Sequence, residues 1–391
     1  MRHLRHMQHH KNSVPEAFKQ EITLEAHQKA AEYTTTKTRF EMFELTLGTL
    51  LLFAWTLGGG LEFLDQQVQH LGLNQIISGV IFILATSILM TIIDLPSNAY
   101  QTFKIEQRFG FNRTTPRLFL SDFAKQLLLS LLLGLPLLWV ILWLMDNAGS
   151  LWWLYAWAVW SLFTLVMMWL YPAVIAPLFN KFSPLEDAAL RQRIEQLLER
   201  NGFQSDGIFV MDGSTRSSHG NAYFTGLGGS KRIVFFDTLL KSLNHDQIEA
   251  VLAHELGHFK HRHVTKRLFT MAISSLLGLA LLGWLMQQPW FFHGLGVSTP
   301  STYTALMLFV LVLPSFTFFM APISSLMMRK HEFEADAFAA QQCEPKHLID
   351  ALVALYKDNA STLTPDPLYA GFHYSHPPAA IRIQHLKESA K

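Results

Sequence analysis

The chain has 391 residues, of which 50% are hydrophobic and 16% are charged, and its formal net charge at pH 7 is +1. Soluble globular proteins are typically about 25% charged, so this composition argues against an ordinary soluble protein. A net charge this small offers no basic field for nucleic acid, and we expect no nucleic-acid partner.

Residues 1–43 form the first segment. Its basic residues and histidines are not followed by an apolar run, so the segment is not a cleaved secretory signal. The cluster of His3, His6, His9 and His10 could bind a metal adventitiously, but a flexible polar tail is the favoured interpretation. We predict a cytoplasmic N-terminal segment with no assigned function.

Six stretches after this segment are apolar enough to span a bilayer, which takes about 20 residues in a helix. They lie near residues 44–64, 76–95, 126–145, 151–179, 267–287 and 305–328. A large soluble protein with six buried helices is the disfavoured alternative. We therefore predict a mainly α, polytopic membrane protein with transmembrane helices 1–4 in residues 44–179 and helices 5–6 in residues 267–328.

The basic residues are distributed unevenly between these spans. No Lys or Arg lies between Arg39 and Lys104, between Lys125 and Lys181, or between Arg267 and Arg329, and each gap holds two spans and the loop that joins them. The positive-inside rule then places four segments on the cytoplasmic side. These are the N-terminal segment 1–43, the loop 96–125, the segment 180–266 and the C-terminal segment 329–391.

The polar segment 180–266 is long enough for a small α+β domain. Ser183 and Pro184 indicate a helix start, and the apolar runs 207–211 and 232–240 are typical of strands. Asn244 resembles the N-cap of a helix that carries the sequence AHELGH at 253–258.

That helix places two histidines on one face. His254 and His258 are four residues apart, so both imidazoles can reach a single ion, while Glu255 lies beside it, placed to take a proton from water. Apolar residues flank the motif at helical spacing, and burying an idle His-His-Glu set is costly. A metal site is therefore favoured over satisfied core histidines. Because Cys343 is the only cysteine, the ligands must be histidines and carboxylates.

A catalytic zinc site requires a third protein ligand. His261 and His263 follow the motif closely, but we expect them to point elsewhere, as supporting or surface groups. Glu332 comes 74 residues after His258, and it shares a helical face with Asp336. One carboxylate can bind the metal while the other orients a ligand histidine; a solvated charged face is the alternative.

Six motifs in order resemble the type I CAAX prenyl endopeptidases, which are integral-membrane zinc metallopeptidases of the gluzincin type. They are IEQRFGFNRTT (105–115), RSSHGNAYFTG (216–226), KRIVFFDTLL (231–240), AHELGHFKHRH (253–263), HEFEADAFA (331–339) and FHYSHPPAAIRI (372–383). The resemblance covers most of the chain but leaves out the first 30 or so residues.

The resemblance implies a role for each matching residue. It makes His254, His258 and Glu332 the ligands of Zn²⁺, with Glu255 as the general base that activates the attacking water. It makes His376 the group that holds the oxyanion. Asn221 would lie beside a substrate strand, and the NAYF sequence fits pairing of an extended peptide with a strand edge. Arg382 would pair with Asp336.

The resemblance also implies a fold, a reaction and partners. The helices would surround an intramembrane chamber, with residues 180–266 as a cytoplasmic zinc-peptidase domain and residues 329–391 carrying the third ligand. The reaction would be cleavage near the C-terminus of prenylated, CAAX-type proteins, with membrane lipid as a further partner. Eukaryotic members have seven spans, whereas six are predicted here.

The setting and the substrate leave alternatives open. The unadorned N-terminus and the C-terminal sequence KESAK favour a bacterial inner membrane, with the active site on the cytoplasmic side, over the endoplasmic reticulum. A bacterial source favours a quality-control protease of membrane proteins as a rival function. From another class, a non-catalytic membrane scaffold, or a transporter with a structural metal, is disfavoured. The sequence does not indicate an oligomeric state.

Overall fold

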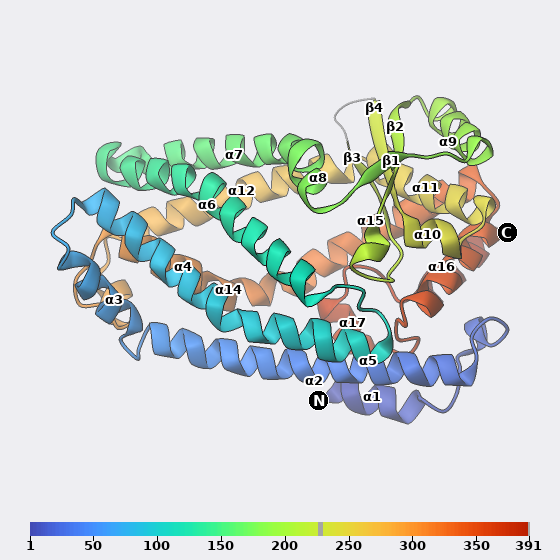
Figure 1. Cartoon of the computed structure of the whole chain (residues 1–391), viewed down its shortest axis with the longest axis horizontal. Coiled ribbons are helices and arrows are strands. Elements are labelled where there is room, and N and C mark those ends of the chain that lie inside the picture. The colour runs from blue at the N-terminus through green and yellow to red at the C-terminus, as the bar shows by residue number, and fades with distance from the viewer. Residues whose placement is uncertain (226–229, 390–391) are drawn as a thin grey trace.

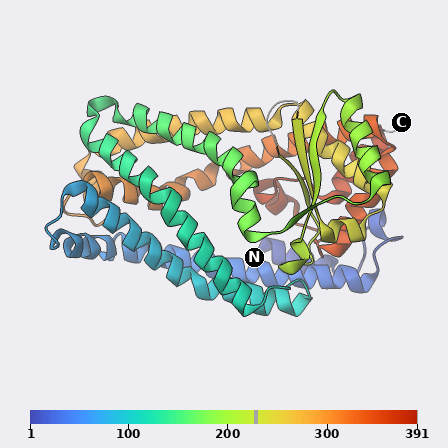
Figure 2. The same cartoon turned by 45° about the horizontal axis from the view of Figure 1, so that its top comes forward.

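The computed structural model describes residues 1–225 and 230–389. Long helices fill one end of an elongated molecule, and a small sheet with shorter helices forms the other (Figure 1; Figure 2, turned by 45°). Gly226, the last residue of the motif RSSHGNAYFTG, lies outside the described residues.

Five helical stretches in the described residues are long and apolar enough to cross a membrane, and a bent helix pair raises the number to six. The five are Gln75–Phe109, Pro116–Asn147, Gly149–Phe179, His263–Leu285 and Thr302–Gln342. Together with the bent pair, they contain or overlap all six predicted spans, so the predicted fold class is confirmed.

Several of these stretches consist of more than one helical element. The first holds α4 (Gln75–Tyr100), η2 (Gln101–Glu106) and α5 (Gln107–Phe109), and the second is α6 (Pro116–Asn147). The third holds η3 (Gly149–Leu151), α7 (Trp152–Leu170), η4 (Tyr171–Ile175) and α8 (Ala176–Phe179). The fourth is α12 (His263–Leu285), which α13 (Pro289–His293) connects to the fifth, made of α14 (Thr302–Thr317), η6 (Phe318–Met320) and α15 (Ala321–Gln342).

The bent pair consists of α2 (Leu24–Trp55) and α3 (Gly60–Gln69), whose axes differ by 47°. The three glycines of the sequence LGGG explain the bend. Gly59 has a φ of 77°, a left-handed conformation that glycine adopts without a steric penalty. The first predicted span, 44–64, is therefore a broken helix rather than a straight one.

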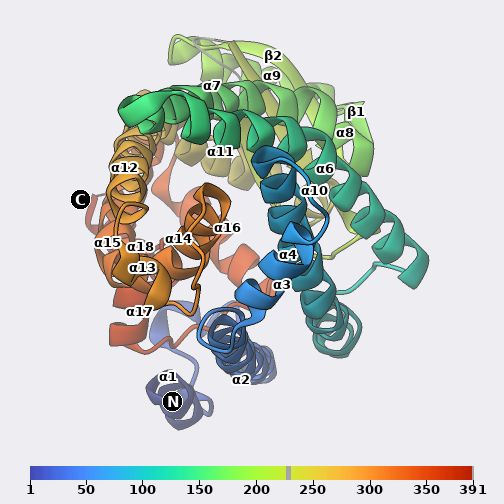
Figure 3. The same ribbon diagram turned by 90° about the vertical axis from the view of Figure 1, so that its left-hand side faces the viewer.

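The membrane helices form a closed circuit of contacts. The helix α12 contacts α7, α7 contacts α6, α6 contacts α4, α4 contacts α14, and α14 returns to α12. Figure 3, which looks along the molecule, shows these helices grouped around the long axis. The arrangement agrees with the predicted ring of helices, whereas the chamber inside it stays a prediction.

The small domain is built on a four-stranded sheet with the order β1-β2-β4-β3. The strands are β1 (Phe182–Pro184), β2 (Gln204–Met211), β3 (Ala222–Thr225) and β4 (Ser230–Phe236). β2 and β4 are parallel, and β1 and β3 pair antiparallel with them at the two edges. Helices α9 (Ala188–Arg200), α10 (Asp237–Ser242) and α11 (His245–Lys260), with η5 (Gly213–Thr215), complete this part of the chain.

Two predicted boundaries in this domain are wrong. Pro184 lies in the edge strand β1, and the helix begins later because the Asp187 side chain accepts a hydrogen bond from the Leu190 N–H. The strand predicted over 232–240 ends at Phe236, because Asp237 begins α10 and its carboxylate accepts hydrogen bonds from Ser214. The short strand β3 was missed, since four residues carry little periodicity.

The N-terminal residues are not a flexible tail. They form α1 (Arg2–His10), in which the His3 side chain stacks on Tyr369 with ring centroids 4.1 Å apart. Arg2 Nε lies 2.8 Å from an Asp366 oxygen. Both partners lie more than 360 positions away, so the N-terminal sequence alone could not indicate this packing. Nearby are η1 (Glu16–Phe18), α16 (Pro345–Asp358), α17 (Pro367–His373) and α18 (Ala379–Ser389).

Candidate metal centre

The helix that carries AHELGH is fixed at its start and along its face. Asn244 caps α11 in a reciprocal capping box with Gln247, as the sequence predicted. Gly257 lies against α15, where a Cβ on this glycine would be 3.0 Å from the Cα of Ala335. Only a residue without a side chain allows this close approach, which brings the two halves of the site together.

Three predicted ligand side chains converge between α11 and α15. The Nε2 atoms of His254 and His258 are 3.3 Å apart. Glu332 places Oε2 3.5 Å from His254 Nε2 and Oε1 3.3 Å from His258 Nε2. All three offer a ligand atom within 4.8 Å of the others, which suits one metal ion.

A buried carboxylate and a buried guanidinium support this cluster. Asp336 Oδ1 lies 2.8 Å from Nδ1 of His254, so this carboxylate orients the imidazole from behind. Arg382 makes two hydrogen bonds to Asp336, at 2.9 and 2.6 Å, and its Nη1 lies 3.2 Å from Glu332 Oε2. The structure therefore brings Asp336 and Arg382 together, which is the pairing that the family resemblance implies.

The donor set fits a metal cation. Among the described residues, Oε2 of Glu332 is buried without a hydrogen bond of good geometry, although Arg382 lies beside it. Burial opposes a charge on His254, but hydrogen bonds to Asp336 and Glu332 prevail and raise its pKa to about 9. The same negative potential that retains a proton on this imidazole favours a divalent cation between the three side chains.

Glu255 follows the ligand His254 on α11, and its side chain is partly exposed. Its carboxylate makes no hydrogen bond or ion pair with another described residue, in contrast to the carboxylates of Glu332 and Asp336. A carboxylate without a partner beside a cation site can accept a proton from water.

His376 and Asn221 are placed differently. His376 lies at the solvent-exposed side of the cluster: its side chain is 63% exposed, and its Nε2 is 3.4 Å from Oε1 of the ligand Glu332. Asn221 is exposed immediately before β3, and its carbonyl oxygen accepts a hydrogen bond from the N–H of Phe236 in β4. Its side chain accepts one from the N–H of Ala222, and it makes no hydrogen bond to the metal cluster within the part of the chain that the structure describes. The edge strand β3 begins at the next residue, Ala222.

The expectation for His263 is partly wrong. Of the two positions that the sequence left open for it, supporting or surface, it does not take the surface one, because it is 5% exposed. It also does not point elsewhere, since its Nδ1 lies 2.9 Å from Nδ1 of His258. Its Nε2 lies 2.8 Å from Glu334, a residue that the sequence did not single out. Residues two apart on a helix lie on different faces, so the position of Glu334 after Glu332 in α15 gave no local signal for this contact.

Both parts of the chain match known family models. Residues 3–181 match the model described as CAAX prenyl protease N-terminal, five membrane helices. Residues 184–390 match peptidase family M48. The chain belongs to peptidase family M48. The match also corrects the sequence expectation, because it begins at residue 3 and includes the N-terminal residues left outside the resemblance; these residues form the packed helix α1.

Several M48 relatives cover nearly the whole chain. CAAX prenyl protease 1 homolog of Arabidopsis thaliana is 36% identical over 95% of this chain and 90% of its own length. CAAX prenyl protease 1 of Saccharomyces cerevisiae is 35% identical over 95% and 88%. The crystal structure of S. mikatae Ste24p matches with a TM-score of 0.89 and 34% identity, covering 98% of this chain and 93% of that one. The protein is therefore a membrane metallopeptidase, as predicted.

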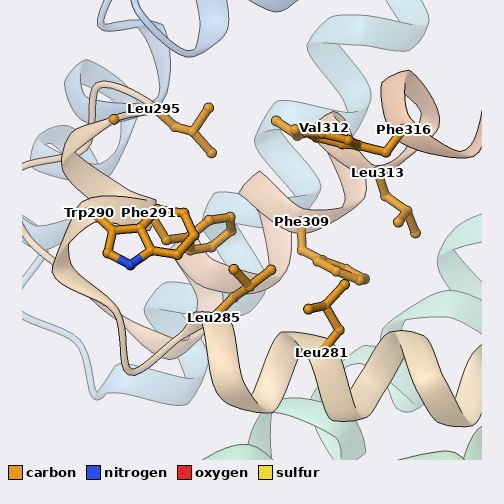
Figure 4. A pocket seen from close by; sticks show the side chains of 10 residues that line it. Leu281, Leu285, Trp290, Phe291, Leu295, Phe309, Val312, Leu313 and Phe316 are labelled. Atoms are coloured by element: carbon orange, nitrogen blue, oxygen red, sulfur yellow. The ribbon is translucent and has the colours of Figure 1, made fainter.

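A separate apolar pocket of about 380 Å³ lies between α12, α13 and α14 (Figure 4). Its walls are almost entirely aliphatic and aromatic, and they include Leu281, Trp290, Phe309 and Phe316. Leu281 follows His263 by 18 residues along α12, which corresponds to about 27 Å at 1.5 Å per residue. None of the residues that line the pocket belongs to the metal cluster, so the two sites are separate.

Proposed function

We propose that the protein is a zinc endopeptidase that cleaves near the C-terminus of CAAX-type proteins. The observation that carries the proposal is the convergence of His254, His258 and Glu332. Glu255 follows His254 directly, and its carboxylate has no hydrogen-bond or ion-pair partner among the described residues. Two imidazoles and one carboxylate are a ligand set typical of catalytic zinc. The names of the M48 relatives support the substrate class.

The proposed roles follow from the positions of the side chains. His254, His258 and Glu332 would hold the zinc, which supplies a positive charge that polarises the scissile carbonyl and acidifies water. Glu255 takes a proton from the attacking water and later transfers it to the leaving amine. The imidazole of His376, at the solvent-exposed side of the cluster, donates a hydrogen bond to the oxyanion.

The substrate would bind as an additional strand. β3 is an edge strand of the sheet, because its described hydrogen-bonded neighbour is β4 alone. An extended peptide can pair with the outer edge of β3, with Asn221 at its beginning. This arrangement would present one peptide bond to the metal centre.

The proposed setting is a membrane whose cytoplasmic side carries the site. The basic segments 180–266 and 329–391, which carry the ligands, support this orientation. A bacterial inner membrane is the proposed compartment, and a eukaryotic source would imply the endoplasmic reticulum instead. Membrane lipid and a peptide or protein substrate are the proposed partners.

The test compares wild type, Glu255→Gln and Glu332→Ala as purified protein in detergent. The substrates are a quenched farnesylated C-a-a-X peptide and its unlipidated twin. We expect Glu255→Gln to keep zinc and to lose cleavage by about 10²–10⁴-fold, the usual contribution of a general base. Glu332→Ala is expected to lose both zinc and cleavage.

The outcomes separate the parts of the proposal. Retained cleavage in Glu255→Gln would contradict the role of this carboxylate. Cleavage of the lipidated peptide alone supports the prenyl-type substrate, whereas equal cleavage of both peptides indicates a broader endopeptidase. If wild type binds zinc and cuts neither peptide, a quality-control protease of membrane proteins becomes the better candidate.

A further inference from the structure

Each of the two candidate ligand histidines has a second ring nitrogen, and that of His258 has a buried partner. Its Nε2 faces the metal centre, whereas its Nδ1 lies 2.9 Å from Nδ1 of His263. His263 Nε2 in turn lies 2.8 Å from Oε2 of Glu334. Both distances are those of hydrogen bonds. A continuous chain of contacts thus runs from the metal centre through two imidazoles to a carboxylate.

The backbone places His263 for this contact. Arg262 has a φ of 56°, a left-handed backbone conformation that separates the end of helix α11 from the start of helix α12. His263 therefore begins a new helix instead of continuing the face of α11, and its ring is buried against His258. Left-handed backbone is uncommon for a residue other than glycine, so the turn has a conformational cost.

The direction of each hydrogen bond follows from chemistry, provided that the proposed zinc site is correct. An imidazole binds a metal through a nitrogen that carries no proton. If Nε2 of His258 binds zinc, its Nδ1 carries the proton and donates to Nδ1 of His263. The remaining proton of His263 is then on Nε2, which donates to Glu334.

We propose that His263 and Glu334 are positioning residues that fix the ring orientation and tautomer of the zinc ligand His258. Asp336 does the same for His254 through a direct contact of 2.8 Å. The two ligand histidines are thus supported differently: His254 by a carboxylate itself, and His258 by a carboxylate acting through a second histidine. Such partners orient a ligand and make it a better donor to the metal.

A second metal site is the rival interpretation, because His263, His331 and Glu334 also lie close enough to hold an ion. An ion there would need the unprotonated Nε2 of His263, which moves the proton to Nδ1. That proton would meet the Nδ1 proton of His258 across 2.9 Å. Zinc on His258 and an ion on His263 therefore exclude each other in this geometry, which favours the hydrogen-bonded chain.

The test measures zinc affinity and stoichiometry of the full-length protein in detergent, by competition with a chelator of known affinity. His263→Leu leaves the Nδ1 proton of His258 without an acceptor, and we expect a loss of about 10–100-fold in zinc affinity. His263→Asn places an amide oxygen near the position of Nδ1 and should retain most of the affinity. Glu334→Gln keeps an acceptor but loses the charge, so its effect should be intermediate.

Two neighbouring histidines provide the controls. His331 stacks on His263 with ring centroids 3.9 Å apart, and His331→Phe keeps that contact while removing the nitrogens. His261 also stacks on His263, at 5.6 Å, and is exposed. We expect His331→Phe and His261→Ala to bind one zinc with an affinity within about twofold of wild type. Monodisperse elution and an unchanged melting temperature identify variants that fold.

Each outcome decides something. The proposal is wrong if folded His263→Leu binds zinc with wild-type affinity. It is also wrong if His263→Asn loses as much zinc affinity as His263→Leu does. Two zinc ions per wild-type chain, one of which is lost in His331→Phe and Glu334→Gln, replace the proposal with a second metal site. A wild type that binds no zinc contradicts the proposed function and this inference together. Zinc binding without cleavage contradicts only the proposed substrate.

Discussion

At the scale of single residues, the metal centre depends on charges that are buried together. The side chain of Asp336 is completely buried, and it contacts both His254 and Arg382. Arg382, whose side chain is 9% exposed, also faces Glu332. A buried charge is tolerated only when it is paired and hydrogen-bonded, so these residues stabilise the structure as a group.

Asp336→Ala should therefore be strongly destabilising. It leaves the guanidinium of Arg382 buried with a weaker partner, which costs about 3–5 kcal/mol of unfolding free energy. Zinc affinity should also fall by about 10–100-fold, because His254 loses the carboxylate that orients it. Asp246→Ala, which breaks a half-exposed ion pair with Arg193, is the matched control and should cost at most about 1 kcal/mol. Denaturant unfolding in detergent and chelator competition measure the two effects; equal costs for both variants would contradict the argument.

The reactivity of the single cysteine, Cys343, also depends on its buried surroundings. Burial raises the pKa of the Cys343 thiol to about 11, and its Sγ lies 3.2 Å from the carbonyl oxygen of Ala339. A raised pKa leaves the thiol protonated at neutral pH, and only the thiolate reacts with alkylating reagents. We expect maleimide labelling at pH 7.5 to be about 300-fold slower than for a free cysteine, whose pKa is about 8.5, and to rise about tenfold per pH unit toward pH 11. Rapid labelling of folded protein at pH 7.5 would show that the thiol is not protected.

At the scale of helices, the contact between α11 and α15 assembles the site. The two helices carry different ligands, so their separation sets the distances within the cluster. Gly257 lies at their closest approach, where an added Cβ would be 3.0 Å from the Cα of Ala335 and 3.2 Å from the Cβ of Phe338. Both neighbours are backbone or near-backbone atoms and cannot rotate away.

Gly257→Ala should consequently separate the helices. We expect a loss of about 1–3 kcal/mol of unfolding free energy from overpacking, with weaker zinc binding because Glu332 moves with α15. The matched control is Gly278→Ala in α12, where the nearest atom is 3.9 Å away. That change should be neutral, or stabilising by up to about 1 kcal/mol, because alanine restricts the unfolded chain. Unfolding and zinc titrations in detergent provide the comparison, and a harmless Gly257→Ala would rule out this contact as the determinant.

The edge strand β3 makes a different prediction, which depends on the proposed function. In an antiparallel pair, the backbone groups of alternate residues point toward the partner strand. N-methylation of successive amides in the substrate should therefore raise KM at every second position, by about tenfold for one lost hydrogen bond. A series of singly N-methylated peptides, with zinc content as the control, tests this. A uniform cost at all positions would exclude strand pairing.

At the scale of the whole molecule, local patterns predicted more than contacts between distant residues. Hydropathy located the five apolar helical stretches and the bent pair α2–α3, and the spacing of His254 and His258 indicated the metal site, because each of these signals is local in the sequence. The docking of His3 on Tyr369 and the contact between His258 and His263 were not foreseen. The first depends on residues more than 360 positions apart, and the second on the left-handed turn at Arg262, which no local pattern indicates.

The orientation in the membrane can be tested with the same chain. Because the spans occur in three pairs, the loops within the pairs should lie opposite to the basic segments. His70 is exposed in such a loop, and Ser150 is exposed in η3, at the end of the third stretch where it meets the loop after α6. Lys11 and Lys346 are exposed on the predicted cytoplasmic side. Each is changed to cysteine in turn, and the slow labelling expected of Cys343 keeps the background low. A membrane-impermeant maleimide should label Ser150→Cys and His70→Cys in intact cells, and Lys11→Cys and Lys346→Cys only after permeabilisation.

The pattern of labelling distinguishes the possible topologies. If α2 and α3 form one bent span, Lys11→Cys and His70→Cys lie on opposite sides of the membrane. If the pair does not cross, these two positions label together, and the span number falls to five. With five spans, the two ends of the chain would lie on opposite sides. Labelling of Lys346→Cys in intact cells would place the metal centre outside the cytoplasm, because this residue lies at the start of α16, the helix that comes after α15, which carries Glu332.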